Sequence, residues 1–226
     1  MTFDIVIVSN AHSKKHRILT ENAVRTALGA KTSHTINVIV VEQTDATYEG
    51  ATTVRYDFDF NYNKCLNYGA TFGTGEYILF CNNDLIFYDW YSDRLLDAFK
   101  MGYKSLSPYC PRYHRKLQRG SHLYEGYVIQ HHIAGWCIAT ERKMIEGIGG
   151  FDEAVAFWFS DNLYVDQLRH HNIKHALVCN AIVEHIDMGS ATLKGSKRGN
   201  EYTYGQRALY EEAKKKYYGK RKQGKS

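Results

Sequence analysis

Hydrophobic positions in the first half of the chain follow two different patterns. Short, β-branched apolar runs of the kind found in buried parallel strands occupy residues 3–9, 36–42 and 76–81. Stretches with helical character separate or follow these runs, at about 14–28, 61–72 and 90–101. Strands and helices in alternation predict βαβ units built on a parallel sheet.

The other predicted elements are shorter and less regular. Segment 103–125 is basic and tyrosine-rich and holds both prolines, Pro108 and Pro111, which favours a loop over the functional face of the sheet. Strands are predicted at 53–58, at 127–140 with a break at Gly135, at 174–179 and at 181–186, and helices at 141–150 and 160–171. The whole pattern predicts an α/β fold in which helices flank a central sheet.

Length and composition narrow the class of protein. The chain has 226 residues, of which 44% are hydrophobic and 23% charged, values that favour one large folded domain and exclude a mostly disordered chain or a membrane bundle. Its five cysteines are odd in number and lack any C-x-x-C spacing, which argues for a reducing compartment and against structural zinc. No stretch approaches ~18 apolar residues and no signal peptide is evident, so we expect a cytoplasmic protein.

The charge is unevenly distributed. Residues 194–226 carry 11 Lys and Arg against 3 Glu, so this segment is strongly basic while residues 1–193 are slightly acidic. A basic segment on an acidic body favours an anionic partner such as nucleic acid, a phosphorylated glycan or an acidic membrane surface, although a solvated tail has the same composition. Tyrosines interleaved with these charges can stack on bases or sugars, or pack onto the body: Tyr202, Tyr204, Tyr210, Tyr217 and Tyr218.

Three polar clusters stand where predicted strands end. They are Ser9-Asn10, Glu42 and Asn82-Asn83-Asp84. No G-x-G-x-x-G or P-loop sequence accompanies them, so neither a dinucleotide fingerprint nor an ATPase cradle is present. A carboxylate flanked by amides at a strand end suits a hard divalent cation that bridges two phosphates, whereas the alternative is a simple turn.

The order of these motifs resembles the nucleotide-sugar glycosyltransferases of the GT-A fold, specifically the inverting family 2 type, over roughly residues 3–186. The resemblance implies one α/β domain at 1–193 with a mixed, mainly parallel sheet, followed by a basic, helical segment at 194–226. IVIVSN, with Ser9 and Asn10, is similar to the nucleotide-binding turn of that family, and VVEQ, with Glu42, to the strand that holds the base or ribose.

The segment NYNKCLNYGATFGTGEYILFCNND resembles the helix, turn, strand and D-x-D motif of the same family. Asn82 and Asp84 stand in the D-x-D places, with Asn83 between them, so the resemblance makes Asp84 the main metal ligand. Lys64 and Asn67, on the preceding helix, are expected to touch the nucleotide.

The most specific match is HIAGWCIATERKMIEGIGGFDEAVAFWFSDN. It is similar to the acceptor strand and GGFDE turn of the family, and it implies that Asp161 is the general base, although Ser160 replaces the usual Glu before it. VEHI resembles the strand whose histidine completes the metal site, here His185. Candidate acceptor contacts are Gly135, Trp136, Asp152 and Trp158, of which the tryptophans could equally be plain core.

The implied activity is a metal-dependent, inverting hexosyl or pentosyl transfer from a nucleotide-diphosphate sugar, with UDP favoured by family habit. The family uses Mn²⁺ or Mg²⁺ as a Lewis acid, and one oxygen with one nitrogen ligand suits Mn²⁺ better. Without an evident membrane anchor, the basic loop 112–119 and the basic tail favour DNA bearing a hydroxymethylated base as acceptor, as in bacteriophage DNA-modifying enzymes that act in the host cytoplasm. The alternatives are a lipopolysaccharide or capsule transferase and a non-catalytic nucleic-acid-binding protein on a transferase scaffold.

Overall fold

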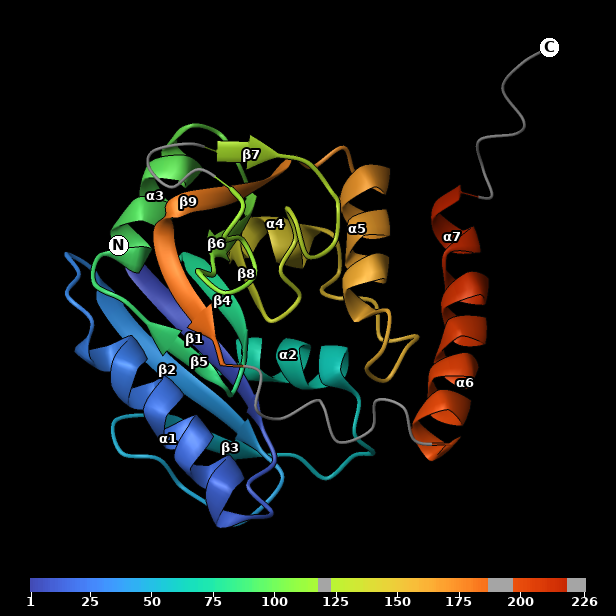
Figure 1. Cartoon of the computed structure of the whole chain (residues 1–226), viewed down its shortest axis with the longest axis horizontal. Helices are drawn as coiled ribbons and strands as arrows, with labels where there is room; N and C mark the ends of the chain where they lie inside the picture. The colour runs from blue at the N-terminus through green and yellow to red at the C-terminus, as the bar shows by residue number, and fades with distance from the viewer. Residues whose placement is uncertain (118–122, 187–196, 219–226) are drawn as a thin grey trace.

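One mixed sheet organises the residues that the computed structural model describes, which are 1–117, 123–186 and 197–218, with side chains from Thr203 onward in the last segment. The strand order is β3-β2-β1-β4-β8-β6-β9-β5, and β7 pairs with β9 (Figure 1). The strands are β1 (Thr2–Ser9), β2 (Thr35–Glu42), β3 (Thr52–Arg55), β4 (Tyr77–Asn82), β5 (Leu85–Phe87), β6 (Ser105–Tyr109), β7 (Leu123–Glu125), β8 (Cys137–Glu141) and β9 (His175–His185).

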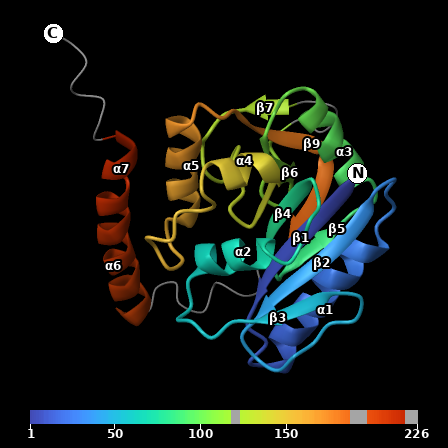
Figure 2. The same cartoon turned by 180° about the vertical axis from the view of Figure 1, so that it is seen from behind.

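Helices cover both faces of the sheet, as the two opposite views show (Figure 1, Figure 2). They are α1 (Lys14–Gly29), α2 (Tyr62–Ala70), α3 (Tyr91–Lys100), α4 (Arg142–Gly147), α5 (Ser160–His170), α6 (Lys197–Ala213) and α7 (Lys215–Tyr218). Successive side chains of a strand point to opposite faces, so β1 contributes Ile5 and Ile7 to the core under α1 and α3, and Val6 and Val8 to the core under α2, α4 and α5. The helices α6 and α7 form a further layer, which lies outside α5 at the edge of the molecule.

The predicted α/β architecture is confirmed, and the sheet is evenly mixed. Parallel pairing joins β3, β2, β1 and β4, as the alternating pattern predicts, and joins β6 to β9. Antiparallel pairing joins β8 to β4 and β6, and joins β5 and β7 to β9. The mainly parallel character is therefore confined to the half that precedes the Asn82-Asn83-Asp84 motif.

The sequence-based assignment is wrong for parts of the second half. The segment expected to be a loop contains β6, whose five residues are all buried. Its polar side chains have distant partners, because Ser105 contacts Tyr164 (2.7 Å) and Ser107 accepts a hydrogen bond from the Ala134 amide (3.0 Å). Pro108 fits because the pairing with β9 shifts register between it and the next residue. The strand expected from residue 127 begins only at Cys137, and the two late strands are the single strand β9.

A buried ion pair between Asp4 and Arg142 stabilises the end of the sheet at which β1 begins. The Asp4 carboxylate is fully buried and accepts hydrogen bonds from Arg142 (2.6 Å), the Gly75 amide (2.6 Å) and the Asn37 amide group (3.0 Å). Arg142 also donates to the carbonyl oxygens of Gly75 and Ala70. The pair thus links β1, β2, the turn before β4 and α4, which are distant in sequence.

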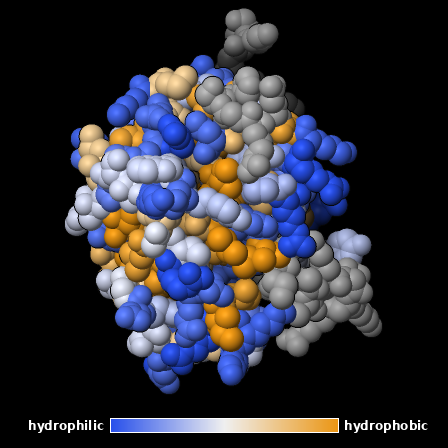
Figure 3. Space-filling view, turned by 60° about the vertical axis from the view of Figure 1, so that its left-hand side comes forward, coloured by the Kyte–Doolittle hydropathy of each residue, from blue (hydrophilic) through white to orange (hydrophobic). Residues whose placement is uncertain are grey.

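In the described segments, no helix combines the length and the apolar character needed to cross a membrane. The face shown in Figure 3 carries hydrophobic residues in patches among hydrophilic ones.

Replacing Arg142 by Met is expected to lower the free energy of unfolding by about 3–5 kcal/mol, because it leaves the Asp4 carboxylate buried without its cation. Urea denaturation followed by circular dichroism measures the loss. Arg17→Met is the matched control, since it removes an ion pair with Glu21 that is half exposed and is worth less than about 1 kcal/mol. Equal losses in both variants would contradict a structural role for the buried pair.

Candidate active site

The carboxyl ends of β1, β2 and β4 meet at one edge of the sheet. Their register pairs Ser9 with Glu42 and Val8 with Asn82, so the polar residues that end these strands lie side by side. A cleft at this edge is lined by Val8, Ser9, Asn10, His12, His16, Phe60, Tyr62, Asn82, Asn83, Asp84 and Phe157. Ligands of α/β sheets bind beyond the carboxyl ends of parallel strands, so this cleft is the candidate site.

Glu42 holds the surrounding turns from inside the protein. Its fully buried carboxylate accepts hydrogen bonds from the Tyr48 hydroxyl (2.6 Å), the Thr44 amide (2.9 Å) and hydroxyl (3.0 Å), and the Ala11 amide (3.0 Å). Burial raises the pKa of this carboxyl, but these hydrogen bonds outweigh burial and lower the pKa overall. The Glu42 carboxylate therefore fixes the turns after β1 and β2, and its expected contact to base or ribose stays a prediction.

Hydroxyl groups fix the side-chain amides of the cleft. Asn82 Oδ1 accepts a hydrogen bond from the Tyr62 hydroxyl (2.7 Å). Asn83 donates to the Thr20 hydroxyl (3.0 Å), which also contacts the Ser9 hydroxyl (2.8 Å). With its oxygen engaged, Asn82 presents its NH₂ group as the part that can donate to a ligand oxygen. The first D-x-D position is thus suited to donating a hydrogen bond through its amide nitrogen.

Asp84 meets the last strand of the sheet. It directly precedes β5, which pairs antiparallel with β9 so that Leu85 opposes His185, and the Ile186 amide donates to the Asp84 carbonyl oxygen (3.0 Å). This pairing places Asp84 Oδ1 3.1 Å from His185 Nε2, and the two side chains are only 5% and 8% exposed. Residues about a hundred positions apart are therefore brought together in a buried pair at the edge of the cleft.

Aromatic rings hold the imidazole of His185. Trp136 and Tyr113 both stack on it, with ring centroids 5.5 and 5.6 Å away. The Nδ1 atom of His185 makes no hydrogen bond to the described residues, whereas Nε2 faces Asp84 Oδ1. The stacked rings thus fix the orientation of the imidazole, with Nε2 directed at the Asp84 carboxylate. Tyr113 comes from the basic segment that the sequence places over the functional face.

Asp84 and His185 have the spacing of two ligands to one cation. Ligands about 2.1 Å from a metal ion, and at right angles around it, lie about 3 Å apart. The 3.1 Å between the carboxylate oxygen and the imidazole nitrogen fits this arrangement. The described part of the chain contains no group of three or more His, Cys, Asp or Glu side chains that could hold a metal. A cation held here would complete its shell with water or substrate phosphates, as Mg²⁺ commonly does.

Asp161 lies in the first turn of α5, against Gly135. A Cβ atom added to Gly135 would lie 3.0 Å from Asp161 Cβ and 3.1 Å from Asp161 Oδ2, so only glycine leaves the carboxylate its present space. Burial raises the pKa of Asp161, and the hydrogen bond from the Asn162 amide (2.9 Å) only partly offsets it. A partly buried carboxylate with a raised pKa is a stronger base than an exposed one.

Tyr62 lines the cleft, and it is absent from the residues that the sequence singles out. Burial raises the pKa of its phenol well above the ordinary value, with smaller contributions from two buried thiols and from Asp84 and Asp161. The phenol therefore stays protonated, as its hydrogen bond to Asn82 requires. The only signal in the sequence is its place at the start of the helix that precedes the motif strand.

Aromatic side chains form one wall of the cleft. The ring of Phe157 meets Tyr62 edge-on at 5.7 Å and lies 6.3 Å from Phe60. Trp158 packs edge-on against Phe157 at 5.3 Å, and its buried indole nitrogen has no hydrogen-bond partner among the described residues. Trp158 is thus next to the cleft, behind a residue that lines it.

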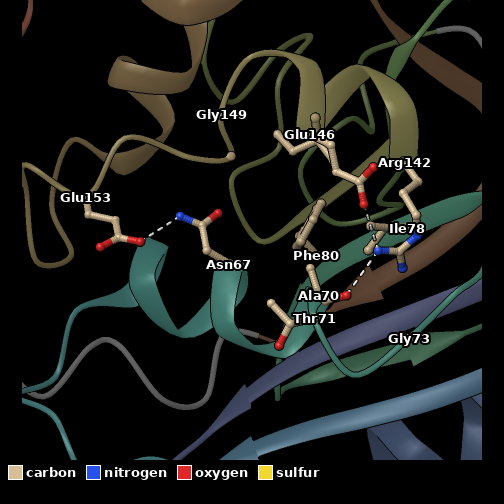
Figure 4. A pocket seen from close by; sticks show the side chains of 12 residues that line it. Asn67, Ala70, Thr71, Gly73, Ile78, Phe80, Arg142, Glu146, Gly149 and Glu153 are labelled. Atoms are coloured by element: carbon tan, nitrogen blue, oxygen red, sulfur yellow. Dashed lines mark hydrogen bonds and ion pairs between the residues drawn. The ribbon is translucent and has the colours of Figure 1, made fainter.

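Three residues expected in the site lie outside the cleft. Lys64 places its ammonium over the Phe58 ring, 4.2 Å from the centroid. Asn67 lines a separate hollow between α2 and α4 (Figure 4), where it bonds both backbone groups of Phe151 and the Glu153 carboxylate. Asp152 accepts hydrogen bonds from Tyr217 and Lys216, on α7. In the structure their polar groups contact the protein's own side chains, turns and helices, and the expected contacts to nucleotide and acceptor stay predictions.

Histidines that the sequence analysis overlooks stand at the mouth of the cleft. The rings of His12 and His16 lie 4.3 Å apart, and Asn10 beside them is exposed and accepts a hydrogen bond from His12 through its carbonyl oxygen. Burial lowers the pKa of His16, and His12 and Lys15 lower it further. Two histidines four residues apart at the start of the first helix are the sequence signal that could have identified them.

The basic segments are only partly within the described residues. In the loop 112–119, Arg112 donates to the Ile186 carbonyl oxygen, while residues 118 and 119 lie outside the described residues. In the tail 194–226, residues 194–196 and 219–226 lie outside them as well. Three lysines at the start of α7 and directly before it form ion pairs with carboxylates. Lys214 pairs with Glu211, Lys215 with Glu212, and Lys216 with Asp152.

The fold is similar to that of solved structures. No protein-family model and no curated protein matches the sequence. A crystal structure of GalNAc-T7 with UDP, GalNAc and Mn²⁺ superposes with a TM-score of 0.63 at 12% identity, covering 82% of this chain and 44% of that one. The mannosyltransferase PcManGT from Pyrobaculum calidifontis, with GDP-Man and Mn²⁺, gives 0.59 at 14% identity, over 83% of this chain and 58% of that one.

A third structure agrees with these two. It is a mutant Drosophila β1,4-galactosyltransferase 7 with manganese, UDP-Gal and xylobiose, which gives a TM-score of 0.54 at 16% identity over 82% of this chain and 71% of that one. The chain therefore has the GT-A fold of glycosyltransferases, and it spans less than two thirds of the first two of these structures.

Asp161→Asn is expected to stabilise the folded protein near pH 7. The pKa of Asp161 is raised above its ordinary value of 3.8, so ionisation is penalised in the folded state. The penalty is absent at a pH below the pKa of the unfolded state, and it is complete at a pH above the raised pKa of the folded state. The gain in stability of the variant should therefore vanish in acid, at about pH 3. Urea denaturation across this pH range measures it.

Asp93→Asn is the control of opposite sign. Burial raises the pKa of Asp93, but hydrogen bonds from Thr32 and Ser33 lower it overall, so this variant should lose stability near pH 7 and converge with the wild type in acid. An Asp161→Asn variant less stable than the wild type near pH 7 would contradict the raised pKa.

Proposed function

We propose that the protein is a metal-dependent glycosyltransferase that moves a sugar, with inversion, from a nucleoside-diphosphate sugar to an acceptor hydroxyl. The observation that carries the proposal is the buried Asp84–His185 pair at the carboxyl edge of a GT-A sheet, together with Asp161 beside Gly135 in the first turn of α5. The structural counterparts were solved with UDP, GDP-Man or UDP-Gal and with manganese, which supports the same class of donor here.

The proposed general base is Asp161. In an inverting transfer the acceptor oxygen attacks the anomeric carbon on the face opposite the leaving diphosphate, and a carboxylate on the acceptor side takes its proton. Gly135 leaves room beside the Asp161 carboxylate. Burial raises the pKa of Asp161, which makes it a stronger base than an exposed carboxylate. The acceptor hydroxyl would therefore bind near Gly135, with its proton directed at Asp161 Oδ2.

The donor side is assigned to Asp84, His185 and Asn82. Asp84 Oδ1 and His185 Nε2 would hold the cation, which stabilises the negative charge of the departing diphosphate when bound. The Asn82 NH₂ group, oriented by Tyr62, would donate a hydrogen bond to a donor oxygen. The histidines at the cleft mouth add donors on the same side. UDP is the proposed nucleotide, and Mn²⁺ suits the mixed oxygen and nitrogen ligands.

The proposed acceptor is DNA that bears a hydroxymethylated base. The basic composition of 112–119 and 194–226 supports a polyanion, and the aromatic wall at Phe157 offers a ring against which a flipped base can stack. The rival acceptor is a lipid-linked glycan of lipopolysaccharide or capsule synthesis. The rival from a different class is a non-catalytic protein that binds nucleic acid through a transferase scaffold.

Release of nucleoside diphosphate tests the proposal for the donor. With Mn²⁺ and a panel of nucleotide sugars, the wild type should release the diphosphate, and a chelator should abolish the release. Asp84→Asn should lower the rate at least about a hundredfold because it removes the charge of the carboxylate that holds the cation. Asp161→Asn should lower transfer by roughly 10²–10⁴-fold because the proton acceptor is lost.

The control for these variants is Asp97→Asn, an exposed carboxylate of α3 that pairs with Arg94, and it should leave the rate unchanged. Thermal melting shows that each variant is folded. Equal rates for Asp84→Asn and Asp97→Asn would exclude the proposed metal site, and a wild type silent across the panel would favour the non-catalytic protein.

A separate comparison tests the acceptor. Hydroxymethylcytosine DNA should stimulate diphosphate release, unmodified DNA should not, and binding to either should weaken steeply with salt because counterions are released from phosphates. Stimulation by a lipid-linked glycan, with no response to DNA, would replace the DNA acceptor and keep the transferase.

A further inference from the structure

We infer that α6 and α7 clamp the loop 152–160, and that Gln206 is the positioning residue through which they set the acceptor side of the cleft. The sequence predicts either a nucleic-acid contact or packing for this tyrosine-rich segment, and its described part is docked on the body. The effect on catalysis rests on the proposed function, whereas the clamp itself rests on contacts alone.

Gln206 is the centre of the clamp. It is 7% exposed, and its Oε1 atom accepts hydrogen bonds from the backbone amides of Ala156 (2.5 Å) and Phe157 (3.3 Å). The same stretch is bonded on its other side, because the Ala156 carbonyl oxygen accepts from the Tyr62 amide (2.7 Å). The peptide group between Ala156 and Phe157 therefore connects α6 directly to the first residue of α2.

This connection leads into the cleft. Tyr62 donates through its hydroxyl to Asn82, and the Phe157 ring lines the cleft and meets Tyr62 edge-on. A shift of the loop away from Gln206 would thus displace a wall of the cleft and the residue that orients Asn82. The contacts run without interruption from the outer helix to the donor edge.

A strained residue marks the end of the same loop. Phe159, just before α5, has a φ of 69°, in the left-handed region that bulky residues rarely adopt. Such a conformation persists when the surrounding structure enforces it. Here Tyr210 of α6 stacks on the Phe159 ring, with centroids 5.3 Å apart and planes within 7°, and its hydroxyl donates to Asp166 (3.0 Å). α6 therefore supports the turn from which Asp161 is presented.

Further contacts anchor the two helices to the body. The hydroxyl of Tyr217 donates to Asp152 (2.5 Å), and that of Tyr218 to Asp166 (2.5 Å). Tyr217 also packs in a small apolar cluster with Val155 and Leu163. The described tyrosine side chains at 210, 217 and 218 are thus engaged with the body, which favours support of the acceptor loop over stacking on a nucleic acid.

Hydrogen exchange of the loop tests the clamp without any substrate. Gln206→Met keeps the side-chain length but removes the acceptor, so the amides of Ala156 and Phe157 should exchange at least about tenfold faster. Gln206→Glu keeps an oxygen acceptor and should restore protection. Arg207→Met changes an exposed residue of the same helix and should leave exchange unchanged. Unchanged protection in Gln206→Met would overturn the clamp.

Two measurements on the same variants test positioning. Binding of UDP with Mn²⁺ should weaken less than turnover in Gln206→Met, since the loop reaches Asn82 only through Tyr62, and the Asp84–His185 pair lies outside the loop. Turnover with saturating hydroxymethylcytosine DNA should fall roughly ten- to a hundredfold in Gln206→Met, because misplacing a reacting group by about 1 Å lowers the rate by this factor. Gln206→Glu should restore turnover. Faster exchange with unchanged turnover would overturn the positioning role. A wild type that binds no UDP would instead refute the proposed function, and hydrogen exchange would still decide the clamp.

Discussion

The parallel register of β1, β2 and β4 is the constraint on which the cleft depends. It sets Ser9, Glu42 and Asn82 at one edge, and the buried Glu42 carboxylate then fixes the turns that follow the strands. A one-residue slip of β4 would exchange its two faces and carry Asn82 away from the hydroxyl of Tyr62. Core packing on both faces of the sheet therefore protects the site as much as the polar contacts within it.

The fold was predictable where neighbouring residues carry the signal. Apolar runs and helical periodicity are local, so β1, β2 and β4 and the helices between them follow from the sequence. β6 does not follow from the sequence, because the composition of SLSPY favours a loop. Its serines are accommodated in a buried strand by contacts with Tyr164 and Ala134, which are distant in sequence. The same holds for the single strand β9, whose pairing with β6 shifts register between Pro108 and Tyr109.

The site was predictable to the extent that motif order identifies it. Asp84, His185, Asp161 and Gly135 follow from their places in the pattern, and the structure brings them together in two adjacent pairs. The sequence marks Glu42, Lys64 and Asn67 as candidate ligand contacts, and only the folded chain shows which groups of the protein they also contact. Tyr62 and Gln206 carry no motif, since their importance comes from contacts with distant backbone.

The docking of α6 on the acceptor loop also orders events during synthesis. A chain emerging from the ribosome completes all the strands of the described sheet before Gln206 is made, and domains begin to fold as they emerge. At that stage the loop before α5 still lacks its contacts with Gln206 and Tyr210. The acceptor side of the cleft therefore depends on a part of the described chain that is synthesised after every strand of the sheet.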